Sequence, residues 1–111
     1  MTALRAPLPV VPELRLDLPR PDVRDAARVA ALCGEPVRAA ILAMLRDGPH
    51  CVCEMAGALG ERENNVSNHL ARLRDAGLVR ASRHGADARW VYYERDEEAL
   101  SAARAALLSV L

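Results

Sequence analysis

The stretch from Glu61 to Gly77, ERENNVSNHLARLRDAG, decides how the rest of the chain is interpreted. Its apolar residues Val66, Leu70 and Leu73 recur at the i, i+4, i+7 spacing, which predicts an α-helix with one buried face. The other face carries short or flexible hydrogen-bonding side chains: Asn64, Asn65, Ser67, Asn68 and Arg72. Such side chains can read base edges in a DNA major groove, where Asn pairs with adenine and Arg with guanine. The same face could also be an ordinary solvated surface, so the flanking segments must decide.

The segment before this stretch predicts a second helix and a tight turn. His50 to Leu59 starts extended and becomes a short helix from about Cys53, and Gly60 closes that helix. Two helices joined in this way form a helix-turn-helix, with the Glu61–Gly77 helix in the reading position.

The segment after it predicts a β-hairpin. Leu78–His84 and Arg89–Glu94 are strands rich in Val, Trp and Tyr, joined by a four-residue loop. Arg83, His84 and Arg89 lie near the tip, where basic side chains suit phosphate or minor-groove contact, as in the wing of a DNA-binding protein. A plain structural hairpin with solvated arginines is the alternative.

The rest of the chain predicts an arm and three further helices. Residues 1–21 hold five of the seven prolines, which predicts an extended arm before a single domain over 22–111. Asp22–Cys33 is a helix that Asp22 can cap, and Pro36 opens the next helix, which runs to about Arg46. The predicted inward stripe of the first of these helices is Val23, Ala27, Ala30 and Ala31.

The last predicted helix, Asp96–Leu111, has an apolar stripe formed by Leu100, Ala103, Leu107, Leu108 and Leu111. A chain of 111 residues buries a modest core, and so apolar a terminal helix leaves surface to cover. We therefore expect a homodimer through the first and last helices. The predicted fold class is mainly α with a β-hairpin (α+β), a winged helix-turn-helix.

Charge and composition narrow the function classes. The formal net charge is zero, yet all fifteen basic residues are Arg, and residues 62–89 hold six of them against three acids, which fits one DNA-facing surface. No long apolar run or signal-peptide pattern is present, which predicts a cytoplasmic protein with reduced cysteines and no membrane partner. An enzyme is disfavoured because no nucleophile–base–acid set, phosphate loop or HExxH motif is present.

Three blocks in this order resemble the ArsR/SmtB family of metal-responsive repressors: ALCGEPVRAAILAMLRDGPHCVCEMAGALG, NVSNHLARLRDAGLV and RWVYYER. The resemblance covers about Val29 to Leu100. It implies a homodimeric winged helix-turn-helix that represses metal-resistance genes and releases double-stranded operator DNA when metal binds. It also places Ser67, Asn68 and His69 in the DNA-contact stretch, directly after Asn64 and Asn65, although His69 could instead be a packed helix residue.

Two positions depart from the pattern of the resembled family. Arg62 stands where the family often has a Ser or Thr helix cap, and Glu35 stands where it usually has Asp before Pro36. Both are weaker caps, so we expect helix boundaries to be affected rather than the fold.

Cys51 and Cys53 form a second candidate site. Residues i and i+2 in an extended lead-in to a helix point the same way, and a helix N-terminus lowers the pKa of a thiol. The two thiols can therefore converge on one soft ion. In the arsenite-sensing branch of the resembled family a third cysteine follows three residues later, where this chain has Ala56. Cys33 could supply the third sulfur from the same or the other subunit, or an exogenous thiol or solvent could take that place.

These features predict a repressor that needs no cofactor and whose inducer is As(III) or Sb(III). Cd(II) or Pb(II) would prefer four ligands, to which His50 could add one. A metal site on the last helix is disfavoured because that helix has no His, despite Glu97 and Glu98. A thiol-redox switch, three simple core cysteines and a protein-interaction module on the same scaffold remain as alternatives.

Overall fold

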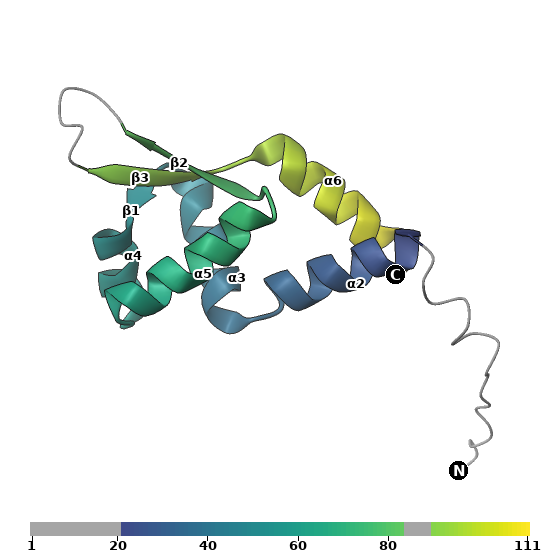
Figure 1. Cartoon of the computed structure of the whole chain (residues 1–111), viewed down its shortest axis with the longest axis horizontal. Helices are drawn as coiled ribbons and strands as arrows, with labels where there is room; N and C mark the ends of the chain where they lie inside the picture. Colours follow the sequence, from purple (N-terminus) through teal and green to yellow (C-terminus); the bar gives the residue numbers. More distant parts are fainter. Residues whose placement is uncertain (1–20, 84–89) are drawn as a thin grey trace, which may run out of the picture.

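The computed structural model describes residues 21–83 and 90–111. Figure 1 shows the elements, which in chain order are α2 (Pro21–Cys33), α3 (Pro36–Met44), the 3-10 turn η2 (Leu45–Asp47), β1 (His50–Cys51), α4 (Val52–Leu59), α5 (Glu63–Asp75), β2 (Val79–Arg83), β3 (Val91–Arg95) and α6 (Glu97–Leu108). Helices α3, α4 and α5 and the sheet form the body of the domain. Helices α2 and α6 pack against each other at the opposite end (Figure 1). Within the described ranges, no helix is long and apolar enough to span a membrane.

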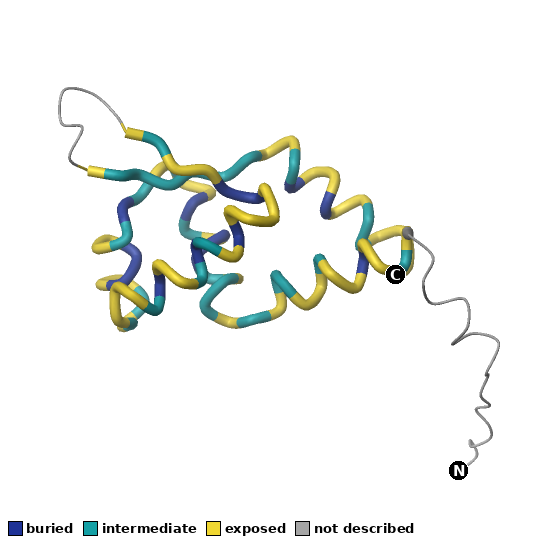
Figure 2. Tube along the Cα trace, in the orientation of Figure 1, coloured by how far each residue is buried: buried dark blue, intermediate teal, exposed yellow. Residues whose placement is uncertain are grey.

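The core lies between α3, α4, α5 and the start of β2, where the buried positions in Figure 2 are concentrated. Its largest fully buried side chains are Ile41, Met55, Val66, Leu70 and Leu73. The last three are the i, i+4, i+7 set of α5, so the predicted apolar face of that helix is confirmed. Burial of this face fixes which side of α5 is left for solvent.

The sheet is antiparallel with strand order β1-β3-β2. The predicted hairpin is confirmed, with Val79 opposite Arg95 and Arg83 opposite Val91. The extended start at His50 was predicted, but its pairing as strand β1 was not: His50 lies opposite Tyr93 and Cys51 opposite Tyr92. A two-residue strand is too short to show the alternation from which strands are predicted. The consequence is that Cys51 belongs to the same sheet as the wing.

The first helix differs from its prediction in two ways. It begins at Pro21, one residue early, so Asp22 lies in the first turn rather than at the cap. Its predicted inward alanines, Ala27, Ala30 and Ala31, are exposed, whereas Ala26 is buried and Val29 and Leu32 pack against the core. In an alanine-rich helix several faces are similarly apolar, and packing against α6 selects one of them. The predicted arm over residues 1–20 lies outside the described residues.

The last helix begins as predicted and ends early. Asp96 caps it by accepting the backbone N–H of Ala99 at 2.9 Å. Leu100 and Ala103 are buried, which confirms the first half of the predicted stripe. Helix α6 ends at Leu108, and Leu108 and Leu111 are 71% and 87% exposed, so the second half of the stripe is uncovered in the single subunit.

Candidate nucleic-acid interface and thiol site

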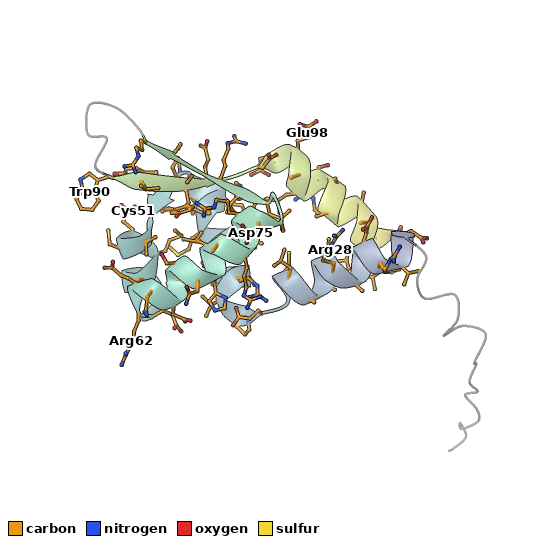
Figure 3. All side chains as sticks on the ribbon, viewed as in Figure 1. Arg28, Cys51, Arg62, Asp75, Trp90 and Glu98 are labelled. Carbon is orange, nitrogen blue, oxygen red and sulfur yellow. The ribbon has the colours of Figure 1, made fainter. Side chains whose placement is uncertain are left out.

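Helices α4 and α5 form the predicted helix-turn-helix. Helix α4 ends at Gly60, whose φ of 66° is left-handed, a conformation that favours glycine. The backbone N–H of Glu61 then donates to the Ala56 carbonyl at 3.0 Å, which closes the turn. At the start of α5 the cap residue Arg62 makes no side-chain capping bond, and Figure 3 shows it pointing away from the body. Arg62 is thus the weak cap that the sequence predicted.

The exposed face of α5 carries four of the predicted DNA-contact residues: Asn64, Ser67, Asn68 and Arg72. Two others are already engaged within the subunit. The Asn65 amide donates to Glu61 Oε1 at 2.7 Å, and the His69 ring is part-buried with Nδ1 3.1 Å from Arg38 Nη1. A role for these six residues in binding DNA stays a prediction, and the geometry leaves the first four freest to approach a ligand.

Strands β2 and β3 extend outward from the body of the domain (Figure 1). Arg83 at the end of β2 is exposed, and Trp90, just before β3, is 49% exposed and lies at the outer end of the sheet (Figure 3). The predicted wing residues His84 and Arg89 lie outside the described residues. Sequence reasoning did not single out Trp90, although an aromatic residue beside the predicted wing tip was a visible signal.

Cys51 and Cys53 lie where β1 passes into α4. Cys51 is the extended N-cap of α4, with φ −87° and ψ 167°, and Cys53 lies in the first turn of the helix, which begins one residue earlier than predicted. Cys51 is buried and Cys53 is exposed. The Cys53 side chain nevertheless lies close enough to raise the pKa of the Cys51 thiol. The structure therefore brings the two thiols together, one facing the core and one facing solvent.

A capping box surrounds Cys51. The Glu54 carboxylate accepts the Cys51 backbone N–H at 2.9 Å, and the Cys51 sulfur accepts the backbone N–H of Glu54. The hydrogen bond from the Cys51 backbone holds the pKa of the Glu54 carboxyl below its usual value, and His50, 3.3 Å from Glu54 Oε1, adds to this effect. His50 is thus engaged by Glu54 rather than by the thiols.

The expectation of a lowered thiol pKa is wrong for Cys51. Burial raises the pKa of this thiol, and its hydrogen bond with Cys53 and the nearby Glu54 carboxylate raise it further. The Glu54 backbone N–H at the start of α4 acts in the opposite direction but is outweighed. The Cys51 thiol is therefore protonated at neutral pH, and a ligand that binds its sulfur must displace that proton.

Cys33 does not complete a site within the subunit. It is half-buried at the end of α2, and burial raises the pKa of its thiol despite the nearby Arg38 guanidinium. Across residues 21–83 and 90–111, no three His, Cys, Asp or Glu side chains gather closely enough to hold a metal ion. Of the predicted ligand set, the described subunit brings together Cys51 and Cys53 and leaves Cys33 apart.

The corner between α2 and α3 holds a helix cap that the sequence predicted only as a weak one, and a contact that it did not predict. Glu35 caps α3 after all, because its carboxylate accepts the Arg38 backbone N–H at 2.8 Å and has its pKa lowered by that bond. The acidic residue before Pro36 was a visible signal for this cap. The contact between Arg38 and His69 spans 31 positions and had no signal in the sequence.

Comparison with known proteins identifies a family that shares these features. The family model "Bacterial regulatory protein, arsR family" matches residues 35–81, which run from the cap of α3 into β2. The arsenic resistance transcriptional regulator ArsR1 of Pseudomonas putida is 42% identical over 57 residues, 51% of this chain and 42% of that protein. The chain spans about half the length of the curated relatives it matches.

Two solved structures cover more of the chain. One, a possible transcriptional regulator for arsenical resistance, aligns with a TM-score of 0.65 and 32% identity over 78% of this chain and 83% of its own. The other is the homodimeric winged helix-turn-helix domain of Mb0332 from Mycobacterium bovis, with a TM-score of 0.62, 30% identity and coverage of 84% and 82%. The winged helix-turn-helix prediction is therefore confirmed, and this chain belongs to the arsR family of bacterial regulatory proteins, which are DNA-binding transcriptional regulators and not enzymes.

Proposed function

We propose that this protein is a dimeric repressor that reads operator DNA with α5 and releases it when a thiophilic metalloid, As(III) or Sb(III), binds Cys51 and Cys53. The observation that carries the proposal is the placement of two neighbouring thiols at the β1–α4 junction, one short helix before α5. The arsenic resistance regulators among the relatives support the choice of ligand.

For DNA, the proposal assigns base contact to the exposed face of α5 and phosphate contact to the wing. Asn64, Ser67 and Asn68 offer donors and acceptors that fit base edges in the major groove. Arg72 of α5, which also lines the hollow between α2, α5 and α6, and Arg83 of β2 add positive charge, while His84 and Arg89 stay predicted wing contacts.

The thiol site and the DNA-reading helix are joined through β1 and α4. Cys51 lies in the sheet opposite Tyr92 of β3, and Cys53 is in the first turn of α4, which packs against α5. Drawing both sulfurs onto one ion pulls a wing strand and the first helix of the helix-turn-helix toward each other. A coupling free energy of about 1–3 kcal/mol, the usual allosteric range, would lower DNA affinity by about 5- to 150-fold.

The ligand chemistry fits two sulfurs from each subunit. Arsenous acid can exchange two hydroxyl groups for the Cys51 and Cys53 sulfurs, each thiol proton leaving in a water molecule with no change of oxidation state. The third position on arsenic would go to Cys33 of a second subunit, a small thiol or the remaining hydroxyl. Cd(II) or Pb(II), which prefer more ligands, and a thiol-redox response are the alternatives on the same scaffold.

Dimerisation is proposed through α2 and α6. Ala27, Ala30 and Ala31 of α2 and Leu108 of α6 are exposed although their pattern is that of buried residues. A hollow of about 670 Å³ lies between α2, the end of α5 and α6, lined largely by apolar side chains. A second copy would cover these surfaces, as two subunits associate in the homodimeric Mb0332 domain.

The first experiment is a titration of reduced protein with arsenite, following the near-ultraviolet absorption of thiolate–arsenic bonds. We expect saturation at one arsenic per subunit in the wild type and loss of the signal in Cys51→Ser and Cys53→Ser, which remove half of the sulfur pair. In parallel, arsenite should weaken wild-type DNA binding by about 5- to 150-fold and leave both variants bound. The matched control is Cys33→Ser.

The Cys33→Ser variant distinguishes a three-cysteine site from a two-cysteine site. Weaker arsenite binding by Cys33→Ser would place Cys33 in the site from a second subunit, and unchanged binding would leave a two-cysteine site completed by an outside ligand. If the wild type shows neither absorption nor release of DNA, arsenic is not the inducer, and Cd(II) and oxidants become the next candidates.

Proton release gives a second test that separates arsenic from divalent metals. The pKa of Cys51 is raised, so at neutral pH a divalent cation must expel a proton into solvent to bind its sulfur. The apparent affinity for Cd(II) should then rise at least about tenfold for each pH unit between pH 6 and 8. Arsenous acid loses hydroxyl groups that carry the thiol protons away as water, so its affinity should stay nearly constant. An arsenite affinity that rises as steeply as that for Cd(II) would contradict this exchange.

A further inference from the structure

Arg38 joins three helices at one corner of the domain. Its Nε donates to the Leu32 carbonyl at 2.5 Å and its Nη2 to the Ala31 carbonyl at 3.4 Å, so it satisfies carbonyls in the last turn of α2 that have no partner within that helix. Its backbone N–H donates to the Glu35 carboxylate, which caps α3. The guanidinium is thereby held at the end of α2, and the Arg38 backbone at the cap of α3.

The third side of this corner is α5. Arg38 Nη1 lies 3.1 Å from His69 Nδ1, and Glu35 Oε1 lies 3.7 Å from the same nitrogen. A guanidinium can only donate, so His69 Nδ1 accepts and the ring proton is assigned to Nε2. The His69 and Glu35 side chains are 18% and 31% exposed, which shields the contact in part from water.

This contact adds a directional restraint to an α5 whose buried face is already fixed by packing. The apolar packing of Val66, Leu70 and Leu73 holds the helix against the core, but apolar contacts are not directional and allow small rotations and shifts. The Arg38–His69 hydrogen bond is directional. His69 directly follows Ser67 and Asn68, so fixing its ring against α3 fixes the direction in which these two exposed side chains point.

From this geometry we infer that Arg38 is a positioning residue for DNA recognition, acting through His69 to hold the reading face of α5 in register with α2. The inference rests on the proposed function in one respect, that α5 reads base edges. It goes beyond that function in giving His69 an internal role instead of a DNA contact. It also links the proposed dimer helix α2 to α5 through a single side chain.

The test compares two affinities for each variant. The specific probe is a duplex that the wild-type protein enriches from a random-sequence library, and the non-specific probe is a scrambled duplex of the same composition. A variant in which the exposed face of α5 is rotated should bind the enriched duplex more weakly. Its affinity for the scrambled duplex should stay nearly unchanged, because phosphate contacts dominate non-specific binding. A smaller folded fraction would lower both affinities by the same factor.

The variants are Arg38→Met, His69→Leu, their double mutant and His69→Asn. Asparagine is the matched control, because its Oδ1 takes roughly the place of histidine Nδ1 and can accept from Arg38. We expect Arg38→Met and His69→Leu each to bind the enriched duplex about tenfold more weakly, and the double mutant to be no weaker than either. His69→Asn should stay within about threefold of the wild type.

Four results would overturn the inference. These are wild-type binding by Arg38→Met and His69→Leu, additive losses in the double mutant, a His69→Asn variant as weak as His69→Leu, and equal losses on both probes. Thermal unfolding checks that each variant is folded, and if Arg38→Met does not fold, the His69→Leu and His69→Asn pair still gives the answer. If the wild type enriches no duplex at all, the proposed function as a DNA reader fails. If the wild type enriches a duplex and the variants bind it equally well, only the role of Arg38 fails.

Discussion

Leu70→Ala should lower the free energy of unfolding by about 2–5 kcal/mol, the range found when a buried leucine is truncated in a core that cannot close the gap. Leu70 is fully buried at the centre of α5 and belongs to the core cluster between α3, α4 and β2. Domains of this size are stable by only about 5–15 kcal/mol in total, so the loss is a large fraction. Urea unfolding followed by circular dichroism measures the change.

The control for Leu70→Ala is Arg46→Ala, because Arg46 is exposed on η2, outside the helices α2 and α6 of the proposed dimer interface. Its truncation should change the free energy of unfolding by less than about 0.5 kcal/mol. A loss below about 1 kcal/mol in Leu70→Ala would mean that the core around α5 is not packed as described. Since α5 carries the proposed reading face, Leu70→Ala should also weaken DNA binding in proportion to the folded fraction that remains.

The fold was largely predictable because its strongest elements are specified locally. The spacing of Val66, Leu70 and Leu73 predicted both the helix and its buried face, and Gly60 and Gly77 mark its turns with left-handed φ values of 66° and 81°. The orientation of α2 was predicted wrongly because local pattern does not say which of several alanine faces meets α6. The pairing of strand β1 was not predicted because its two residues owe that pairing to β3, some forty positions away.

The candidate site was predictable in its membership but less so in its chemistry. The spacing of Cys51 and Cys53 predicted that the two thiols point the same way, but Cys51 is buried and Cys53 is exposed, because Cys53 is already in the first turn of α4. The raised pKa of Cys51 follows first from its burial, and Cys51 lies in the unpredicted strand β1. The link from Arg38 to His69 needs the packing of α3 on α5 and cannot be derived from either helix alone.

The second large effect is expected for Asn68→Ala, which should bind the enriched duplex about 5- to 150-fold more weakly. Asn68 is exposed on α5, and a bidentate contact of an Asn side chain with adenine contributes about 1–3 kcal/mol of discrimination. Affinity for a scrambled duplex should change little, because alanine at this position removes a base contact and no charge. Fluorescence anisotropy with both duplexes at one salt concentration measures the two affinities.

Arg72→Ala separates base reading from charge on the same helix. If Arg72 contacts phosphate, its removal should weaken binding to both duplexes and reduce the salt dependence by about one unit of slope. Arg46→Ala is the charge-matched control, because Arg46 is exposed on η2, outside both α5 and the wing. Equal losses in Arg72→Ala and Arg46→Ala would point to overall charge rather than to α5.

If Asn68→Ala binds the enriched duplex like the wild type while Arg72→Ala weakens it, the base-reading residues lie elsewhere on α5 and the proposed assignment of Asn68 is wrong.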